Sequence, residues 1–495
     1  MYELYPYFTN DGSVGLFSPE DDDIYHSTYG ALSESWEKFT LPANIGEYFK
    51  HNNEIKILDI CYGIGYNTKT ALQASINEIE QFENNNNKNL FKNIFSKNNH
   101  KNFVCVNHNI DPIDTDNILT KNDLSTSELD YKNTSLNSKN ILNNTINNGE
   151  IHSDNIFRQL LDIFSLNSAK DDKKNTQKKT FYVDAVDLDK VLMKISPFII
   201  NEFKSKRDID KYFIDKYFKD TKFQNKLSQV QKIHKNKLIS LPKSRKISKI
   251  CNMILIMNLV NNFPELESDK ILNSLVTQNK NSAFIDKSML NFFSFYSNLG
   301  YKHKQKSKIS AFLHNIYYRY ISMSYKKARK MLEFSDFDIN FHQNDARFFV
   351  KSNDNQYNFI FLDAFTPAKC PSLWTVEFFA QLFRLLSNDG MILTYSNSAA
   401  VRNAMIQNGF CVGKIFDKNM KKFIGTIAAK DENLIDFPLD AKDIDLVNSK
   451  AGICYKDPNL DFSNDTIINN RENELSTSSL ASSSSVMKEY KNAKI

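Results

Sequence analysis

The sequence KILDICYGIGYNT, residues 56–68, decides the fold. An apolar run over 55–60 predicts a strand that is buried on both faces of a parallel sheet. Gly63 and Gly65 follow the run directly, and a helix is expected over 68–76. A strand, a glycine turn and a helix in this order are typical of the first unit of a nucleotide-binding α/β sheet.

Glycine in such a turn lets a ligand approach the backbone, and the start of the helix offers free N–H groups. The third glycine of the dinucleotide pattern is absent, because position 68 is Thr. We therefore expect S-adenosylmethionine at Gly63 and Gly65, with Asp59 and Asn67 among its contacts. A tight turn without any ligand would give the same short pattern.

Six further runs read as strands, and helices are expected between them over 376–386 and 399–408. The strand-like runs cover 181–187, 338–342, 357–365, 390–396, 411–416 and 422–429. This alternation predicts a doubly wound α/β sheet. The last two runs predict a hairpin at one edge.

Acidic residues stand at the ends of the expected strands. Asp187 ends the second strand, where a carboxylate accepts both ribose hydroxyls, although Asp184 and Asp189 are close competitors. Asp345 follows the third strand, where it is expected to accept the adenine amine, with the Ala346 N–H near the ring. Since the carboxyl ends of parallel strands share one edge, these groups predict a single crevice.

The run FLDAFTPAKCPSLWT, residues 361–375, carries the expected chemistry. Asp363 ends the fourth strand, where a methyl-accepting amine would lie, and we expect it to orient that amine rather than act as a full general base. Pro367 and Pro371 stiffen the loop that follows. Trp374 suits a pocket for a flat base. Core packing for Trp374 and helix capping for Asp363 are the alternatives.

Composition excludes several classes of protein. The chain has 495 residues, 41% of them hydrophobic, and a net charge of +5. The longest apolar run, 251–260, is too short for a membrane span, and the N-terminus does not read as a signal peptide. Six cysteines at 61, 105, 251, 370, 411 and 454 form no C-x-x-C pair, so neither a metal site nor a disulfide framework is expected. We expect a reduced, cytoplasmic protein without a membrane partner.

Two segments are of low complexity. Residues 77–180 contain 24 Asn, which predicts a largely disordered or loosely helical insertion that the chemistry does not need. The tail over 471–495, with STSSLASSSS, is also expected to be disordered.

Basic residues gather in two segments. Residues 201–250 hold 15 Lys or Arg against 5 Asp or Glu, and residues 301–330 hold 9 against none. Such clustering favours a nucleic-acid partner, and the tyrosines of 316–320 could stack on bases. Solvated helix faces are the alternative.

The chain resembles the MnmC-like methyltransferase family, the tRNA 5-methylaminomethyl-2-thiouridine methyltransferases. The matching stretches are 9–18 (TNDGSVGLFS), 25–35, 56–68, 344–347, 361–386, 390–410 and 451–460 (AGICYKDPNL). The resemblance implies a class I S-adenosylmethionine-dependent (Rossmann-like) fold and methylation of the aminomethyl group on the wobble uridine of tRNA. It implies that substrate-binding residues come from the N-terminal block and from the loop after the fourth strand: Tyr25, His26, Glu34, Phe365, Pro367, Lys369 and Trp374.

The sequence also departs from the family pattern. No flavin-dependent oxidase region is recognisable, so neither FAD nor a metal is expected, and a separate enzyme would supply the amine. Cys61 and Tyr62 replace the more usual Gly-Phe. We expect an N-terminal block over 1–50 and a methyltransferase domain over 51–460. The domain would be interrupted by the Asn-rich insertion and by a basic helical extension over 195–335.

Two other classes of function stay open at this stage. A small-molecule amine methyltransferase or aminopropyltransferase could use the same fold without tRNA. A non-catalytic RNA-binding relative would tolerate loss of Asp363, which is present here. No obligate protein partner is expected.

Overall fold

The computed structural model describes residues 5–18, 23–27, 29–97, 178–202, 241–263, 266, 284–297, 325–328 and 330–492. The chain divides into two units, one of residues 1–83, 177–297 and 312–495 and one of residues 84–176 and 298–311. Only the continuation of one helix is described in the second unit. The fold and the site below therefore concern the first unit.

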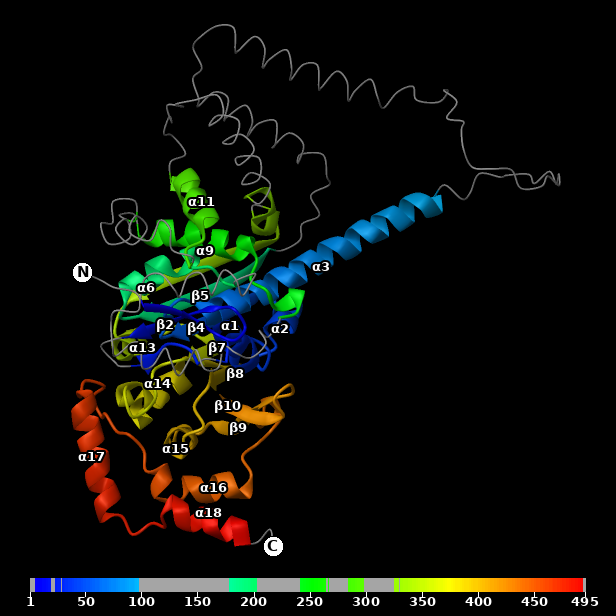
Figure 1. Cartoon of the computed structure of the whole chain (residues 1–495). Coiled ribbons are helices and arrows are strands. Elements are labelled where there is room, and N and C mark those ends of the chain that lie inside the picture. Colours follow the sequence, from blue (N-terminus) through cyan, green and yellow to red (C-terminus); the bar gives the residue numbers. More distant parts are fainter. Residues whose placement is uncertain are drawn as a thin grey trace, which may run out of the picture. The chain divides into compact units, whose positions relative to one another are not determined.

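A seven-stranded sheet forms the centre of the first unit, in the order β6-β5-β4-β7-β8-β10-β9 (Figure 1). Its strands are β4 (Glu54–Ile60), β5 (Lys179–Asp187), β6 (Ser335–Gln343), β7 (Tyr357–Leu362), β8 (Leu386–Thr394), β9 (Cys411–Asp417) and β10 (Lys422–Ala429). The first five in spatial order run parallel, and β10 runs antiparallel to β8 and β9. The seven predicted strands and the edge hairpin are confirmed.

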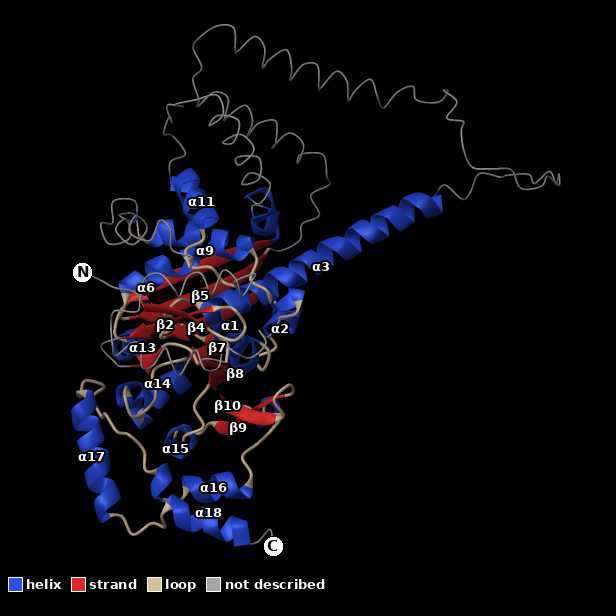
Figure 2. Cartoon of the chain, viewed as in Figure 1, coloured by secondary structure: helices blue, strands red, loops and turns tan. Residues whose placement is uncertain are grey.

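Helices cover both faces of the sheet (Figure 2). Along β4, Ile55 and Ile57 belong to one core cluster, whereas Leu58 and Ile60 belong to the other. The first cluster includes residues of α3 (Tyr66–Lys97), α6 (Lys190–Ile195), α9 (Lys249–Asn262) and α11 (Lys287–Ser297). The second includes residues of α13 (Ala346–Ser352), α14 (Val376–Leu385) and α15 (Ala399–Gln407). The doubly wound fold is confirmed, with the predicted helices found within α3, α14 and α15.

Helix α9 belongs to the core, which corrects the expectation of a basic helical extension over 195–335. The helix carries the longest apolar run of the sequence and buries most of it. Its Asn258 and Asn262 side chains bond the backbone of the edge strand β6: Asn258 Oδ1 accepts the Ile339 N–H (3.2 Å), and Asn262 Oδ1 accepts the Phe341 N–H (3.1 Å). These contacts satisfy backbone groups that an edge strand otherwise leaves unpaired. Most of the two basic segments lies outside the described residues.

The N-terminal residues form a small antiparallel sheet that the sequence analysis did not predict. It consists of β1 (Tyr5–Phe8), β2 (Val14–Ser18) and β3 (Asp23–Ile24), and α1 (Ala31–Ser35), the π-helix η1 (Trp36–Thr40) and α2 (Ile45–His51) follow. Asp11 ties the β1–β2 turn to α1, because its carboxylate accepts the Ser13 N–H (3.0 Å) and the Ser33 N–H (2.7 Å). The Val14 N–H donates to the Tyr66 hydroxyl at the start of α3 (3.1 Å). The N-terminal block is thereby fixed beside the glycine loop.

The C-terminal segment is helical, which corrects the expectation of a disordered tail over 471–495. Helices α16 (Ala441–Val447), α17 (Asn464–Thr477) and α18 (Ser483–Asn492) lie here. Arg471 Nε donates to the Ile453 carbonyl (2.7 Å), and the Tyr490 hydroxyl donates to Asp445 (2.5 Å). Such specific anchors hold a segment whose composition alone suggests disorder. Short helices complete the chain: η3 (Ser196–Phe198), η4 (Lys243–Arg245), η6 (Pro371–Trp374), η7 (Glu432–Leu434) and η8 (Lys450–Gly452).

The Asn-rich insertion is described only at its edges. Residues 77–97 continue α3, and residues 178–180 precede or begin β5. The rest of the insertion lies outside the described residues, so the expectation for it stays a prediction.

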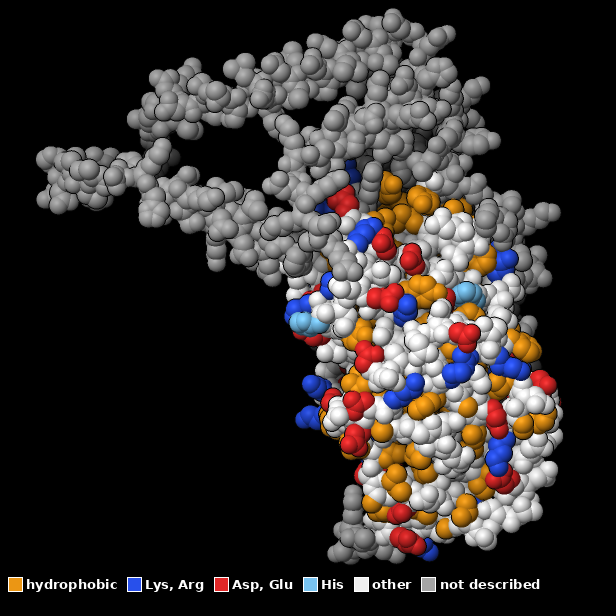
Figure 3. Space-filling view, turned by 180° about the vertical axis from the view of Figure 1, so that it is seen from behind, with side chains coloured by type: hydrophobic (Ala, Val, Ile, Leu, Met, Phe, Trp, Pro, Cys, Tyr) orange, Lys and Arg blue, Asp and Glu red, His pale blue; other side chains and the backbone are white. Residues whose placement is uncertain are grey.

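The face of the molecule seen in Figure 3 mixes charges of both signs. A general attraction for anions therefore cannot be assigned to it, and any charged binding surface has to be found locally. Within the described ranges, no helix is both long enough and apolar enough to cross a membrane.

Candidate active site

The glycine loop joins β4 to α3. Every second residue from 61 to 65 has a left-handed backbone conformation. The φ angles are 63° at Cys61, 54° at Gly63 and 75° at Gly65. A Cβ atom at Gly65 would lie 2.3 Å from the Tyr62 ring, so only glycine fits there. At Cys61 the same conformation costs a side-chain-bearing residue about 1 kcal/mol.

Asp187 is the acid that faces this loop. Its Oδ2 accepts the Gly63 N–H (2.7 Å) and its Oδ1 accepts the Asp189 N–H (2.8 Å). Burial raises the pKa of Asp187 to about 6, and the two backbone N–H groups oppose that rise. A carboxylate at the end of the second parallel strand, bonded to the glycine loop, is placed to accept ribose hydroxyls.

The two competing acids have other partners. Asp184 is buried and accepts hydrogen bonds from the Tyr357 hydroxyl (2.5 Å) and from His342 Nε2 (2.7 Å). Asp189 caps α6 by accepting the N–H groups of Val191 and Leu192. The choice that the sequence left open therefore falls on Asp187.

Asp59 and Asn67 leave buried acceptor atoms unused. Asp59 Oδ2 accepts the Thr68 hydroxyl (2.6 Å), but Asp59 Oδ1 and Asn67 Oδ1 are buried without a partner among the described residues. Burial, followed by the charges of Asp363 and Asp187, raises the pKa of Asp59 to about 8 against the opposing Thr68 bonds. Unpaired buried acceptors are costly, so these two atoms fit a ligand that brings donors or positive charge. The ammonium and sulfonium groups of S-adenosylmethionine meet that requirement.

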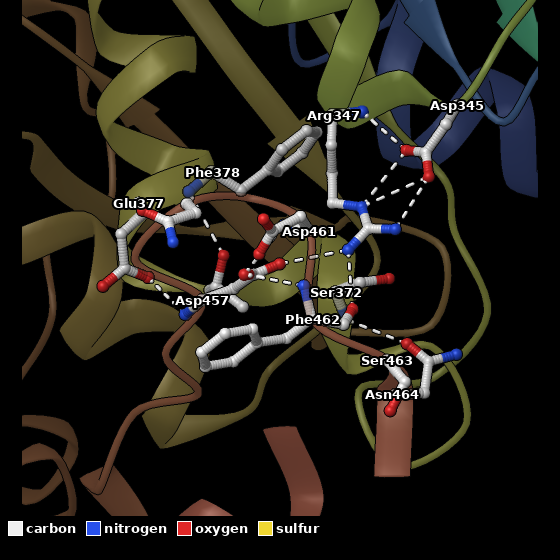
Figure 4. Close-up of polar contacts among 12 residues, drawn as sticks. Asp345, Arg347, Ser372, Glu377, Phe378, Asp457, Asp461, Phe462, Ser463 and Asn464 are labelled. Atoms are coloured by element: carbon white, nitrogen blue, oxygen red, sulfur yellow. Dashed lines mark hydrogen bonds and ion pairs between the residues drawn. The ribbon is translucent and has the colours of Figure 1, made fainter. Parts of the chain in front are cut away.

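Asp345 lies just after β6, as expected, but its carboxylate already accepts hydrogen bonds from Arg347. Figure 4 shows Arg347 between Asp345 and Asp457. Asp345 Oδ1 accepts the Arg347 N–H (2.8 Å), capping α13 at Ala346, and its Oδ2 accepts from Arg347 Nη2 (2.8 Å). A carboxylate has about four acceptor positions. An adenine amine can therefore use only those that Arg347 leaves.

Arg347 is in turn anchored by the segment that follows η8. Its Nη1 donates to Asp457 Oδ2 (3.0 Å) and to the Phe462 carbonyl (2.8 Å). Asp457 is fully buried, and its backbone N–H donates to Glu377 of α14 (2.7 Å). The sequence analysis singled out the KDPN stretch that contains Asp457 but assigned it no role. Neither Arg347 nor Asp457 could be paired from the sequence, because 110 residues separate them.

Asp363 lies at the carboxyl end of β7, beside the glycine-loop helix. Its Oδ2 accepts from Asn67 Nδ2 (3.0 Å), and its backbone N–H donates to the Ile60 carbonyl of β4 (3.3 Å). Burial raises the pKa of Asp363, and the nearby His26 is the main group that opposes the rise. A carboxyl with a raised pKa is a better proton acceptor than an exposed one.

The N-terminal block places Tyr25 and His26 beside the glycine loop and Asp363, with Glu34 close to His26. Tyr25 lies against the loops, with its ring 5.3 Å from that of Phe365 and one ring carbon 3.6 Å from a Cβ built at Gly63. Burial lowers the pKa of His26, although Asp363 and Glu34 act against that shift. Glu34 does not contact this pocket directly, because its carboxylate accepts from Ser27 and from Lys38 Nζ (2.9 Å).

Within the predicted substrate loop, one residue has a different role. Trp374 is fully buried and donates from Nε1 to the Phe365 carbonyl (2.9 Å), so it supports the loop instead of lining a pocket. Phe365 and Pro367 are half-buried, and Lys369 is exposed. The core-packing alternative for Trp374 is therefore the one that the structure favours.

No group of three or more His, Cys, Asp or Glu side chains in the described ranges could hold a metal ion. The acceptors of the crevice match an organic cation with hydroxyl and amine donors.

Parts of the chain are similar to known proteins. Residues 307–429 match the model of a family described as S-adenosyl-L-methionine-dependent methyltransferase. An uncharacterized protein of Methanocaldococcus jannaschii is 31% identical over 140 residues, which are 28% of this chain and 39% of that protein. The tRNA 5-methylaminomethyl-2-thiouridine biosynthesis bifunctional protein MnmC of Pseudomonas putida is 44% identical over 63 residues, 12% of this chain and 10% of that protein.

Among solved structures, MnmC2 from Aquifex aeolicus aligns with a TM-score of 0.44 and 15% identity over 97% of this chain and 87% of that one. The chain spans much less than two thirds of the curated relatives. Over residues 307–429 the chain is thus similar to the class that the sheet and crevice define, the S-adenosylmethionine-dependent methyltransferases. The curated matches confirm its resemblance to the MnmC-like family.

Proposed function

We propose that the protein methylates the aminomethyl group of the modified wobble uridine, 5-aminomethyl-2-thiouridine, in tRNA. The observation that carries this proposal is the position of Asp363. It projects from β7 next to the glycine loop and is bonded to Asn67 of the loop's helix. One short network thus joins the residues expected to hold the methyl donor to the residue expected to hold the amine.

In this proposal the crevice holds S-adenosylmethionine by residues from three strands. Asp187 accepts its ribose hydroxyls, and Asp345 with the Ala346 N–H faces its adenine. Asp59 and Asn67 face its charged groups, since their free oxygens are the unused acceptors of the site. The bound molecule supplies an activated methyl group, so the protein's task is mainly to position donor and acceptor.

Asp363 orients the substrate amine and receives its proton. An alkylamine is mostly protonated at neutral pH and then has no lone pair for attack. The raised pKa of Asp363 brings this carboxyl closer to the range in which it can take up that proton. The neighbouring His26 stays neutral more readily than an exposed histidine, because burial lowers its pKa. It therefore adds little repulsion toward the incoming ammonium.

The aromatic side chains around Asp363 suit a flat base. Tyr25 and Phe365 contact each other at the edge of the glycine loop. We propose that they contact the uridine, with Pro367 and Lys369 on the outer side of the loop. Stacking of a base on an aromatic ring contributes about 1–3 kcal/mol.

The remaining expectations are part of the proposal. The block over 1–50 serves the domain over 51–460, neither FAD nor a metal takes part, and the protein acts in the cytoplasm. A separate enzyme supplies the aminomethyl group, and no obligate protein partner is needed.

Replacement of Asp363 by Asn tests the proposal. Asp363→Asn should keep S-adenosylmethionine binding, because the Asn67 amide can still donate to the new side-chain oxygen. Methyl transfer to tRNA should fall by about 10²–10⁴-fold, the range for a lost acid–base group. Part of the rate should return as the pH rises, since more amine is then neutral. Near-normal turnover at neutral pH would remove Asp363 from the reaction.

A further inference from the structure

The turn between β9 and β10 follows the last described pair of that hairpin, Asp417 with Lys422. Thr426 of β10 pairs with Thr394, the last residue of the parallel strand β8. Because β10 runs antiparallel to β8, the residues before Thr426 extend past the carboxyl end of β8. The turn over 418–421 therefore projects from the edge at which Asp363 follows β7.

Polar contacts fix this turn against η1. Asp417 accepts the N–H groups of Asn419 (2.7 Å) and Met420 (2.9 Å), which holds the turn closed. The Asn419 side chain donates to Glu37 of η1 (3.2 Å). Glu37 also pairs with Arg245 of η4. The hairpin turn, η1 and the loop that contains η4 are thus tied at one point.

The same part of η1 lies next in sequence to charged residues that act on Asp363. Lys38 follows Glu37 and binds Glu34 (2.9 Å). Lys38 and Glu34 both act on the pKa values of His26 and Asp363. Glu37 is therefore within one helical turn of Glu34 and Lys38, whose charges reach His26 and Asp363.

Lysines and an aromatic ring are exposed on these two segments. Lys243, Lys418, Lys421 and Lys422 are exposed, and none has an ion-pair partner among the described residues. Phe423 follows them with 41% of its surface exposed, and its ring lies 5.8 Å from that of the equally exposed Phe437. Of the acids in this part of the structure, Asp417 is bonded within the turn and Glu37 to Arg245, whereas the exposed Asp436 precedes Phe437. We call these four lysines and two phenylalanines the rim surface.

We propose that the rim surface binds the tRNA substrate, with its lysines on backbone phosphates and Phe423 stacked on an unpaired base. This inference rests on the proposed function, because tRNA is the partner it names. The chemistry favours RNA: unpaired lysines match phosphates, and an exposed aromatic ring matches a base face. Base stacking on a ring that lies beside phosphate-binding lysines is a combination that RNA offers directly.

The test compares two variants of the full chain that change the net charge equally. Lys418→Glu/Lys422→Glu alters the rim surface, whereas Lys442→Glu/Lys488→Glu alters α16 and α18. Binding of unfractionated tRNA is measured by fluorescence anisotropy at several salt concentrations, and S-adenosylmethionine binding by calorimetry serves as a folding control. Each lost phosphate contact lowers the salt slope by about 0.7–0.9. Two lost contacts should therefore weaken tRNA binding about 15–30-fold at 0.15 M salt.

The rim variant should lose this affinity and show the shallower slope, while the control variant should bind as the unaltered protein does. Equal binding by both variants, with both still binding S-adenosylmethionine, would overturn the proposal for this surface. An unaltered protein that binds no tRNA at all would instead contradict the proposed function. An equal loss in both variants would show that only net charge matters, which also overturns a local surface.

Phe423 provides a second, independent readout. Phe423→Ala removes the ring, and Phe423→Tyr keeps it. The Ala variant should bind an anticodon stem-loop RNA at least about fivefold more weakly, within the stacking range of 1–3 kcal/mol per base, and should keep the salt slope. The Tyr variant should bind normally. Equal affinity of the two variants would remove Phe423 from the contact.

Discussion

Binding of S-adenosylmethionine should release a proton from Asp59. In the free protein, burial and the neighbouring carboxylates raise the pKa of Asp59 to about 8. At pH 7 about nine-tenths of the molecules then carry this proton. Thr68 occupies one oxygen of the carboxyl, and the other has no partner among the described residues. A cation that arrives at the free oxygen favours the charged form of the carboxyl.

The size of the effect follows from that pKa. A cation within about 4–6 Å lowers the pKa of a carboxyl by 1–3 units, which brings Asp59 to about 5–7. We expect a net release of about 0.4–0.9 proton at pH 7 and about 0.1 or less at pH 9. Calorimetric titration in buffers of different ionisation enthalpy measures this number directly. The isosteric variant Asp59→Asn is the control, because it has no proton to release.

The same pKa gives a stability test in the absence of the ligand. The folded-state pKa of Asp59 lies above its unfolded value of 3.8, so the folded protein binds more protons between about pH 4 and 8. The free energy of unfolding should therefore fall as the pH rises through this window, and Asp59→Asn should flatten the fall. Equal proton release by the variant and the unaltered protein at pH 7 would show that Asp59 carries no proton in the free protein.

Three further changes should separate the roles of the site residues. Gly65→Ala should abolish S-adenosylmethionine binding measured by calorimetry, whereas Gly63→Ala, with no atom closer than 3.6 Å to the new Cβ, should be milder; equal effects would mean that crowding at Gly65 is irrelevant. Arg347→Ala leaves the buried Asp457 without its cation, so the free energy of unfolding in urea should fall by about 3 kcal/mol. Cofactor binding should weaken about tenfold, and Arg347→Lys should restore part of it. Trp374→Phe should raise the KM for tRNA more than that for S-adenosylmethionine, since its indole holds the Phe365 loop; the reverse order would place Trp374 in the cofactor site.

The sheet could be predicted because its signals are local. Apolar runs such as 55–60 and 357–365 end at glycines or acids, and the order of strands and helices fixes the parallel arrangement. The residues at the strand ends, Asp187 and Asp363 among them, followed from the topology alone. In a parallel sheet, the carboxyl ends meet at one edge whatever lies between the strands.

The partners of those residues could not be predicted, because they come from distant parts of the chain. Arg347 bonds the carboxylate of Asp345, the N-cap of α13. Arg347 is held in that position because the fold brings Asp457 beside it. The Asp11 network, which fixes the N-terminal block, also depends on a contact between a turn and a later helix. No local pattern encodes such pairings.

Composition gave the wrong prediction of structure for the C-terminal segment and for the region around α9. The Ser-rich segment before α18 has low complexity, yet the chain around it is held by single contacts such as that of Tyr490 with Asp445. Helix α9 sits between two basic segments, but its apolar face decides its place in the core. Average composition over 50 residues cannot resolve a buried helix of 14 residues.

The central claim is that this chain transfers a methyl group to the aminomethyl nitrogen of a tRNA wobble uridine. The most direct test is mass analysis of nucleosides after tRNA bearing 5-aminomethyl-2-thiouridine is incubated with the purified full chain and labelled S-adenosylmethionine. We expect this nucleoside to gain one labelled methyl group on its amine, and Asp363→Asn to suppress the gain at neutral pH. An unchanged nucleoside, or label found on a small amine in the absence of tRNA, would contradict it.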